Sequence, residues 1–428
     1  MSSLAYAAGQ AESATPLLNP LFSHYSGPPF AIRFWDSTQW SSSELTPAFT
    51  LVLHTPTAWH TLSHTPDELA LAEHYIDGHI DVEGDLYLAL RAIPQIESSI
   101  RSADMTSVPL RVYTAAIAGR MERFLHAGNQ HSQKRDAAAI AYHYDKPPAF
   151  YELFLGPTMV YSCAYFRSPG NTLETAQRDK MDHICRKLAL VPGERFLDIG
   201  CGWGSLTLHA AAQYGAAAHG VSLSQSQVEY ARQRIAAAGQ SANCNIYWSD
   251  FRDLDQVHTP FNKIASVGMV EHVGLKQIDA YFREAYQLLV PNGLFLNHGI
   301  TRRAGTHRGG PSFIDRYVFP DGELLTLTEM IRAAEDAGFE VRDVEDLREH
   351  YEETLHRWVA NLVAHRDEAI ALTDTRTFRI WQLYMAGSAE AFRRGDIAVH
   401  QLLLSKNDQG HSAAARTRDP WYSTNGTH

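Results

Sequence analysis

Between Phe30 and Ile100 the chain alternates short apolar runs with turn-forming residues. Phe49–His54 is a short run of β-branched and large apolar residues, a pattern that predicts a strand. Pro66–Tyr75 begins with proline and two acidic residues and continues in good helix formers, which predicts a helix. A second helix is predicted over Leu86–Ile93. This part of the chain is therefore expected to be a small α+β unit.

The pattern changes in the second half of the chain, where short apolar runs alternate with helical segments. Helices are predicted over residues 205–213, 225–237 and 278–289. Strands are predicted over Arg195–Ile199, Ala217–Val221, Asn245–Trp248, Phe261–Gly268 and Gly293–His298. Strands that alternate with helices imply parallel βαβ units, so the predicted fold class is α/β with a doubly wound sheet.

These patterns divide the 428 residues into two expected domains, residues 29–127 and 140–406. Residues 1–28 are rich in Ala, Ser, Pro and Gly and are expected to be a flexible lead-in. The polar residues 128–139 are the expected linker, and the polar residues 407–428 the expected flexible tail.

The net charge of −11 argues against a nucleic-acid partner, because neutralising phosphates requires a basic surface. A local basic patch can still meet an anionic membrane. The two candidates are Arg302–Arg303 with His307 and Arg308, and Arg393–Arg394; solvated surface is the favoured interpretation of both.

The four cysteines form no C-x-x-C pair, and no run of apolar residues is long enough to cross a membrane. The N-terminal residues lack the charged start and apolar core of a signal peptide. We therefore expect a reduced, cytoplasmic protein. His60 and His64 have H-x-x-x-H spacing, but no glutamate follows His60 and no third ligand is nearby, so we interpret them as loop residues and expect no metal site.

A glycine-rich turn, Gly200–Gly204, follows the first predicted strand of the second domain and precedes a helix. A dinucleotide site requires a sixth-position glycine where this chain has Ser205, and a P-loop requires a lysine that is absent. Asp198 followed by G-x-G-x-G suits S-adenosylmethionine (SAM), which has no pyrophosphate. A tight strand-to-helix turn without a ligand is the remaining alternative.

Two motifs carry a family resemblance, namely RFLDIGCGWG at Arg195–Gly204 and VGMVEHVG at Val267–Gly274. They closely resemble motifs of the cyclopropane-fatty-acyl-phospholipid synthases and the mycolic acid cyclopropane synthases. The match covers about residues 140–406, and its further segments are His143–Asp145, Tyr161–Phe166, Gln177–Leu190, Gly293–Ile300, Tyr351–Leu355 and Ala391–Ile397. The resemblance implies a Rossmann-like class I SAM-dependent methyltransferase domain, preceded by a smaller domain for lipid binding or dimerisation.

The resemblance also implies which residues hold SAM. They are Tyr161, Ser162, Asp198, Gly200, Cys201, Gly202, Trp203, Gly204, Ser222, Leu223, Ser224, Gln227, Asp250 and Phe251. For Ser224 and Gln227, helix capping is an equally good interpretation when the residues are taken alone.

Methyl transfer to a cis double bond leaves a carbocation, and closing a cyclopropane ring then requires removal of a proton from the added methyl group. The family is thought to use a bound bicarbonate ion as the base. The resemblance assigns its ligands to Glu271, His298, Tyr351, Cys163 and Ile300. In this assignment Glu271 accepts the bicarbonate hydroxyl, His298 and Tyr351 donate to its oxygens, and Cys163 and Ile300 contribute mainly backbone groups.

The leading hypothesis is therefore a cyclopropane synthase that acts on unsaturated acyl chains of phospholipids. The alternative is a SAM-dependent C-methyltransferase that makes methyl-branched or methylene fatty acyl chains. A non-catalytic lipid- or SAM-binding protein is the third possibility, against which the complete set of base-site residues argues. As partners the resemblance implies a membrane, contacted peripherally at its inner face, and a second copy of the chain in a homodimer.

This chain departs from the family pattern at Lys146–Ala149, which contains two prolines, and at Ser388, where many members have a cysteine. The first departure affects the expected entry of substrate, and the second removes a thiol once proposed for the active site.

Overall fold

The computed structural model describes residues 15–64, 68–102, 146–253, 260–305, 312–319 and 322–422. The chain forms two compact units. The N-terminal unit comprises residues 1–128, 308–318 and 373–390, and the C-terminal unit comprises the rest. The expected linker at 128–139, the motif His143–Asp145, and the basic residues His307 and Arg308 lie outside the described residues.

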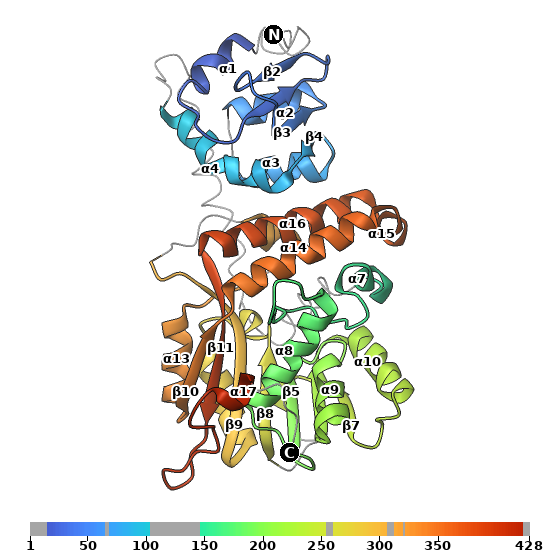
Figure 1. Cartoon of the computed structure of the whole chain (residues 1–428), viewed down its shortest axis with the longest axis vertical. Coiled ribbons are helices and arrows are strands. Elements are labelled where there is room, and N and C mark those ends of the chain that lie inside the picture. Colours follow the sequence, from blue (N-terminus) through green and yellow to red (C-terminus); the bar gives the residue numbers. More distant parts are fainter. Residues whose placement is uncertain are drawn as a thin grey trace. The chain divides into compact units, whose positions relative to one another are not determined.

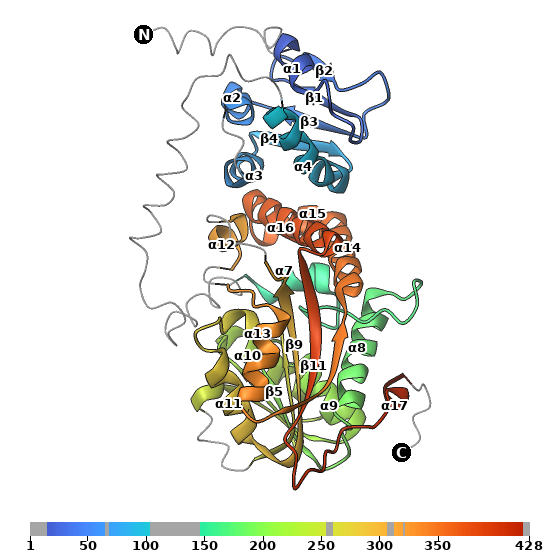
Figure 2. The same ribbon diagram turned by 90° about the vertical axis from the view of Figure 1, so that its left-hand side faces the viewer.

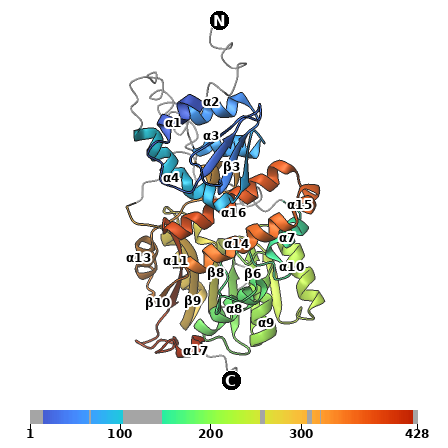
Figure 3. The ribbon, with the colours of Figure 1, turned by 45° about the horizontal axis from the view of Figure 1, so that its top comes forward.

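The N-terminal unit contains a four-stranded sheet of order β2-β1-β3-β4. Its strands are β1 (Phe30–Arg33), β2 (Gln39–Ser41), β3 (Phe49–Leu53) and β4 (Ile80–Gly84). Its helices are α1 (Thr15–Leu21), α2 (Pro56–His64), α3 (Glu68–Ile76) and α4 (Leu86–Ser102), which surround the sheet (Figure 3). The short helix α12 (Phe313–Tyr317) and most of α16 (Thr375–Arg394) also belong to this unit, which is α+β as predicted.

Two predictions for this unit are wrong. The lead-in is not flexible throughout, because Leu18 and Phe22 are buried in the core beside Phe30, whose ring stacks on Phe49 at 5.4 Å. These apolar side chains complete a core that the short strands are too small to enclose alone. His60 and His64 lie in α2, and not in a loop, because the segment from Pro56 carries apolar residues at helical spacing.

The C-terminal unit is built on a seven-stranded sheet of order β10-β11-β9-β8-β5-β6-β7 (Figure 1). Its strands are β5 (Arg195–Ile199), β6 (Ala217–Ser222), β7 (Cys244–Trp248), β8 (Phe261–Val267), β9 (Leu289–Arg302), β10 (Glu340–Asp346) and β11 (Ile397–Ser405). The strands from β9 to β7 are parallel, which confirms the predicted doubly wound sheet. The strands β11 and β10 add to its edge in antiparallel orientation, with β11 beside β9 (Figure 2).

The helices of the unit are α7 (Pro148–Leu155), α8 (Leu173–Lys187), α9 (Ser205–Tyr214), α10 (Gln225–Ala237), α11 (Ile278–Leu288), α13 (Leu327–Asp336), α14 (Arg348–Ala364), α15 (Arg366–Leu372) and α17 (Asp419–Tyr422), with the 3-10 turns η3 (Phe251–Asp253) and η4 (Val270–His272). The helices α8, α9 and α10 cover one face of the sheet, and α11 and α13 cover the other. Among the described helices, none is both long enough and apolar enough to span a bilayer.

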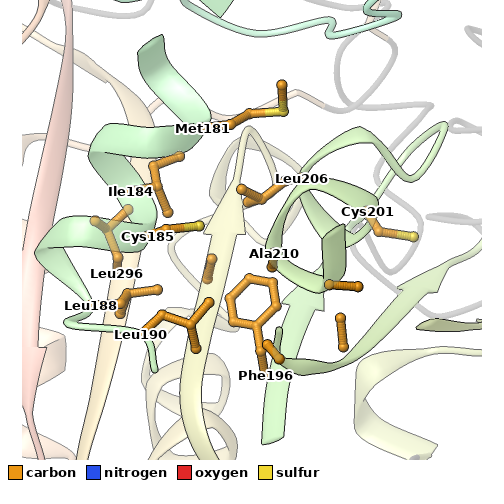
Figure 4. Packing of buried hydrophobic residues seen from close by; sticks show 14 of the residues in the cluster. Met181, Ile184, Cys185, Leu188, Leu190, Phe196, Cys201, Leu206, Ala210 and Leu296 are labelled. Carbon is orange, nitrogen blue, oxygen red and sulfur yellow. The ribbon is translucent and has the colours of Figure 1, made fainter. Parts of the chain in front are cut away.

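Side chains along the strands point alternately to the two faces of the sheet, so a hydrophobic core forms on each face. On one face Phe196 and Leu296 pack with residues of α8, α9 and α10, including Cys185 and Leu206 (Figure 4). On the other face Leu197 and Phe295 pack with α11 and α13. Because successive strand residues point to opposite faces, strands buried on both sides must be apolar throughout, and this is why the sequence shows continuous apolar runs here.

The polar C-terminal segment is not a flexible tail as far as residue 422. Trp421 is 3 % exposed and packs into the core next to α8, with the Lys187 ammonium 5.3 Å from its ring centroid. Arg186 donates a hydrogen bond to the Trp421 carbonyl oxygen at 3.3 Å. Trp421 thus docks this segment together with Ala414, which belongs to the same core, and with the ion pair between Arg418 and Asp343.

Replacing Trp421 by alanine should therefore destabilise the full chain. Loss of a buried tryptophan side chain costs about 3 kcal/mol or more in the free energy of unfolding. Arg416→Ala, at an exposed position of the same segment, is the matched control and should change stability by less than about 0.5 kcal/mol. Urea denaturation followed by circular dichroism measures both. Equal stabilities for the two variants would show that the segment is not docked.

Candidate active site

The glycine turn Gly200–Gly204 lies at the carboxyl end of β5, where the strand order reverses between β8 and β6. The amides of Gly200 and Cys201 donate to the carbonyl oxygen of Val221 at 3.0 and 2.9 Å, which ties the turn to β6. Gly200, Gly202 and Gly204 all have positive φ, between 52° and 78°. Side chains are disfavoured in this conformation, so the three glycines let the chain turn directly into α9.

A cleft opens beside this turn, with an empty volume of about 960 Å³ that includes open solvent. Most of the residues predicted to hold SAM line it. They are Tyr161, Ser162, Asp198, Gly200, Cys201, Gly202, Trp203, Ser222, Leu223, Gln227 and Phe251. A cleft at the carboxyl ends of parallel strands, at a reversal of strand order, is where α/β folds bind ligands.

Three of the predicted cofactor residues do not line the cleft. Gly204 precedes α9 and packs against α10, where an added Cβ would lie 2.8 Å from the Cβ of Ala231. The Ser224 hydroxyl accepts a hydrogen bond from the Gln227 amide and caps α10, so helix capping accounts for it. The Asp250 carboxylate accepts hydrogen bonds from the Arg252 guanidinium at 2.8 and 2.6 Å.

The cleft also contains a buried lysine that the sequence analysis missed. Lys180 projects from α8, is 2 % exposed, and donates to the Ser162 hydroxyl at 2.9 Å. Burial lowers the pKa of this ammonium to about 8. Lys180 is electrostatically coupled to Asp198, whose carboxylate accepts a hydrogen bond from the Thr207 hydroxyl at 2.9 Å. Burial raises the pKa of Asp198 to about 6. A buried cation and a buried carboxylate thus face one cleft, as a zwitterionic ligand would require.

A second group of polar residues lies next to this cleft. Glu271 is in η4, directly after β8, and its neighbours Met269 and His272 both line the cleft. The Ile300 amide of β9 donates to Oε1 of Glu271 at 2.7 Å. The second carboxylate oxygen, Oε2, is buried and has no hydrogen-bond partner among the described residues. Burial raises the pKa of Glu271 to about 7.

His298 is the partner of Val267 in the pairing of β9 with β8 and is 1 % exposed. Its Nδ1 atom lies 3.2 Å from the side-chain nitrogen of Gln401 on β11. Its Nε2 atom is buried without a hydrogen-bond partner in the described part of the chain. Burial, with Lys180 and Lys187 nearby, lowers the pKa of His298 well below its usual value, so the ring is neutral.

Leu347 connects Cys163 and Tyr351 to the strands β9 and β11. The Leu347 amide donates to the carbonyl oxygen of Val399, which is paired with Ile300 across β11 and β9. The Leu347 carbonyl oxygen lies 3.7 Å from the Cys163 sulfur and accepts the Tyr351 amide at 3.1 Å. Cys163 and Tyr351 are thus linked to Ile300 through Leu347 and Val399, Glu271 bonds to Ile300 directly, and His298 lies two residues before Ile300 on β9. None of the five lines the cleft itself.

The geometry limits what these groups can do. Burial raises the pKa of the Cys163 thiol far above its usual value, so it stays protonated and is a poor nucleophile. Tyr351 is 8 % exposed, with its ring 4.6 Å from that of Phe392. Glu271 and His298 each leave one buried polar atom unpaired, and a buried unpaired atom is costly unless a ligand pairs with it.

Comparison with known proteins agrees with this arrangement. The family model described as mycolic acid cyclopropane synthetase matches residues 131–402, and a second model, a domain of unknown function (DUF7884), matches residues 17–104. A probable fatty acid methyltransferase of Pseudomonas putida is 39% identical over 92% of this chain and 96% of its own length. A protein of the same description from Mycobacterium tuberculosis is 36% identical over 87% of this chain and 90% of its own length.

A crystal structure of a mycolic acid cyclopropane synthase complexed with SAH and CTAB has the same fold. It is 35% identical, covers 63% of this chain and 98% of its own length, and superposes with a TM-score of 0.60. Because the family model spans more than half of the chain and relatives match almost from end to end, the chain belongs to the mycolic acid cyclopropane synthetase family of SAM-dependent methyltransferases.

Proposed function

We propose that this protein transfers a methylene carbon from SAM to the cis double bond of an unsaturated fatty acyl chain of a phospholipid. The products are a cyclopropane fatty acyl chain and S-adenosylhomocysteine. The observation that carries this proposal is that Glu271 Oε2 and His298 Nε2 are buried without a hydrogen-bond partner among the described residues, next in the chain or across the sheet to residues that line the cleft. A placed base is required in this reaction because the proton is lost from carbon after the methyl group has been transferred.

The reaction needs a base that is kept away from water. Attack of the alkene on the sulfonium methyl group forms a carbon–carbon bond and leaves a carbocation, and ring closure then releases a proton from the added methyl group. The aromatic rings of Tyr161 and Trp203 line the cleft and can stabilise positive charge there. Glu271 and Ile300 are joined by a hydrogen bond, which fixes the carboxylate near the cleft.

The base-site residues fit a small oxyanion with one hydroxyl group, and bicarbonate is the ion that we propose. When bound, it would supply the base that accepts the proton. Glu271 Oε2 would accept the hydroxyl proton, and the His298 Nε2–H group would donate to an oxygen. Lys180, which is coupled electrostatically to both His298 and Cys163, would offset the negative charge.

A second candidate function shares the cofactor but differs in product. Two relatives that match most of this chain are described as probable fatty acid methyltransferases, which favours a C-methyltransferase that makes methyl-branched or methylene acyl chains. The solved relative is described as a cyclopropane synthase. The two outcomes differ in which carbon loses the proton, and so in where the base lies relative to the acyl chain.

An acyl substrate in a bilayer must be reached from the membrane surface, so we also propose a peripheral contact at the inner face of the membrane. The N-terminal unit, residues 29–127 in the sequence-based division, is the proposed element for lipid binding or homodimer formation.

The cofactor assignment is tested by Gly202→Val. An added Cβ would meet only Gln227 Nε2, at 3.9 Å, so the space beside Gly202 belongs to the cleft and not to the packed interior. We expect SAM affinity to fall at least tenfold, because a side chain here blocks close approach of the ligand to the backbone. Gly239→Val is the matched control, with a similar positive φ at a position with no atoms within 4 Å of the added Cβ. Calorimetry that finds equal SAM affinities in both variants would contradict the assignment.

The base site is tested by Glu271→Gln. The amide keeps the shape of the side chain but can replace an acceptor oxygen by a donor, so the hydroxyl of the anion loses its partner. Turnover should drop by about a hundredfold or more, as for loss of general-base catalysis, while SAM affinity stays nearly unchanged. Glu323→Gln is the local control, because its Oε2 accepts the Leu275 amide at 3.1 Å on the exposed side of the same turn. Near-normal turnover of Glu271→Gln in bicarbonate-depleted buffer would exclude this role.

The product is tested by mass spectrometry and NMR of lipids from cells that express the chain. We expect acyl chains that gain one CH₂ and lose their alkene signals, as cyclopropane formation requires. A gain of CH₂ with alkene signals retained would identify a methylene product. Two further hydrogens would identify a saturated methyl branch, and either result would favour the second candidate function.

A further inference from the structure

A glutamine lies in the most apolar part of β11. Gln401 is fully buried and is followed on the strand by Leu402, Leu403 and Leu404, which are all fully buried as well. Burying an amide costs free energy unless its hydrogen bonds are made. The side-chain nitrogen of Gln401 contacts His298, which lies directly opposite it in the antiparallel pairing of β11 with β9, whereas its side-chain oxygen has no hydrogen-bond partner among the described residues. Side chains at such paired positions project from the same face of the sheet.

The contact between these residues has a direction. The side-chain nitrogen of Gln401, Nε2, lies 3.2 Å from Nδ1 of His298. With the amide in this orientation its nitrogen donates and does not accept, so Nδ1 of His298 is the acceptor. A neutral imidazole carries one proton, which must then be on Nε2. The Nε2 atom is the one that is buried without a hydrogen-bond partner among the described residues.

We propose that Gln401 is a positioning residue that holds His298 in its Nε2-protonated form, so that the unpaired N–H group is presented to the oxyanion of the base site. The inference deepens the proposed function, on which its activity test rests. This form of the His298 ring also makes the site selective for an anion. The opposite form, with Nδ1 protonated, would leave a lone pair on Nε2 in place of the N–H group, and an acceptor there cannot bind an oxygen of an anion.

The register of the sheet enforces this role. The β9–β11 pairing runs without interruption from Ile397 opposite Arg302 to Ser405 opposite Leu294. The backbone of His298 is therefore held opposite that of Gln401, with both side chains on the same face of the sheet. On the other edge of β9, the Gly268 amide donates to the His298 carbonyl oxygen at 2.9 Å, which fixes the backbone of the histidine from the other side.

The tautomer is tested first in the unmodified full chain, labelled with ¹⁵N at histidine. Long-range ¹H–¹⁵N correlation distinguishes a protonated from an unprotonated ring nitrogen, and the spectrum of His298→Gln identifies the signals that belong to His298. We expect Nε2 to be protonated and Nδ1 to be unprotonated. A His298 ring with its proton on Nδ1, which a flipped Gln401 amide would produce, would overturn the proposal whether or not bicarbonate takes part in the reaction.

The positioning role is tested with Gln401→Met, which keeps the length of the side chain and removes the donor. We expect the half-saturating bicarbonate concentration to rise about tenfold or more, the size of effect typical of losing one hydrogen bond to a charged group, with SAM affinity unchanged. Ser405→Ala is the matched control, because Ser405 is a fully buried polar residue on the same face of β11 whose hydroxyl bonds to Asn407 and Ser412. It should leave the bicarbonate dependence as in the parent.

The outcomes separate the two proposals. A half-saturating concentration in Gln401→Met within twofold of the parent, together with unchanged His298 signals, would overturn the role of Gln401. If the parent has the Nε2-protonated ring and Gln401→Met alters its signals, the positioning role is supported. If the turnover of the parent enzyme then does not depend on bicarbonate, the proposed base is refuted, whereas the effect of Gln401 on the His298 ring is not.

Discussion

The pairing of β8 with β5 on one side and with β9 on the other is the constraint on which both parts of the site depend. The carboxyl end of β5 carries the glycine turn, and the carboxyl end of β8 leads directly into Glu271. Because parallel strands end at the same edge of a sheet, a cofactor cleft and an acid–base group become neighbours without any long-range loop. The hydrogen bond from the Ile300 amide to Glu271 then connects β9 to the turn that follows β8.

Burial gives these groups their chemistry. Water would hold a glutamate ionised and a lysine protonated near their usual pKa values, whereas here burial brings the pKa of Glu271 up to about 7 and that of Lys180 down to about 8. The pKa values of both groups therefore lie close to neutral pH, where a proton can be gained or lost at little cost in free energy. The same burial leaves Glu271 Oε2 and His298 Nε2 unpaired in the described part of the protein, and the free energy of that arrangement is recovered only when a ligand binds.

The sequence predicts the parallel part of the fold well, because strands buried on both faces are rich in apolar residues, as at Leu294–Leu296 of β9. It fails for β10 (Glu340–Asp346), an edge strand with no fully buried residue and no apolar run to mark it. Motifs place the cofactor residues from Tyr161 to Phe251, but they do not distinguish a lining residue from a capping one such as Ser224. Lys180 and Gln401 escape prediction because a lysine on a helix or a glutamine on a strand normally indicates exposed surface, and only the packed structure shows them buried.

The antiparallel strand β11 shows why a methyltransferase sheet of this kind needs more than its parallel strands. It is paired along most of β9, and so it covers the edge at which His298 and Ile300 would otherwise meet solvent. One of its residues, Gln401, contacts His298. The carbonyl oxygen of another, Val399, accepts a hydrogen bond from the amide of Leu347, and the Leu347 carbonyl oxygen in turn contacts Cys163 and Tyr351. The strand β11 thereby shields the proposed base site from solvent and fixes the backbone positions of His298 and Ile300. In the proposed mechanism the sheet fixes the position of the base, so the way in which the acyl chain lies against it would decide which carbon loses a proton.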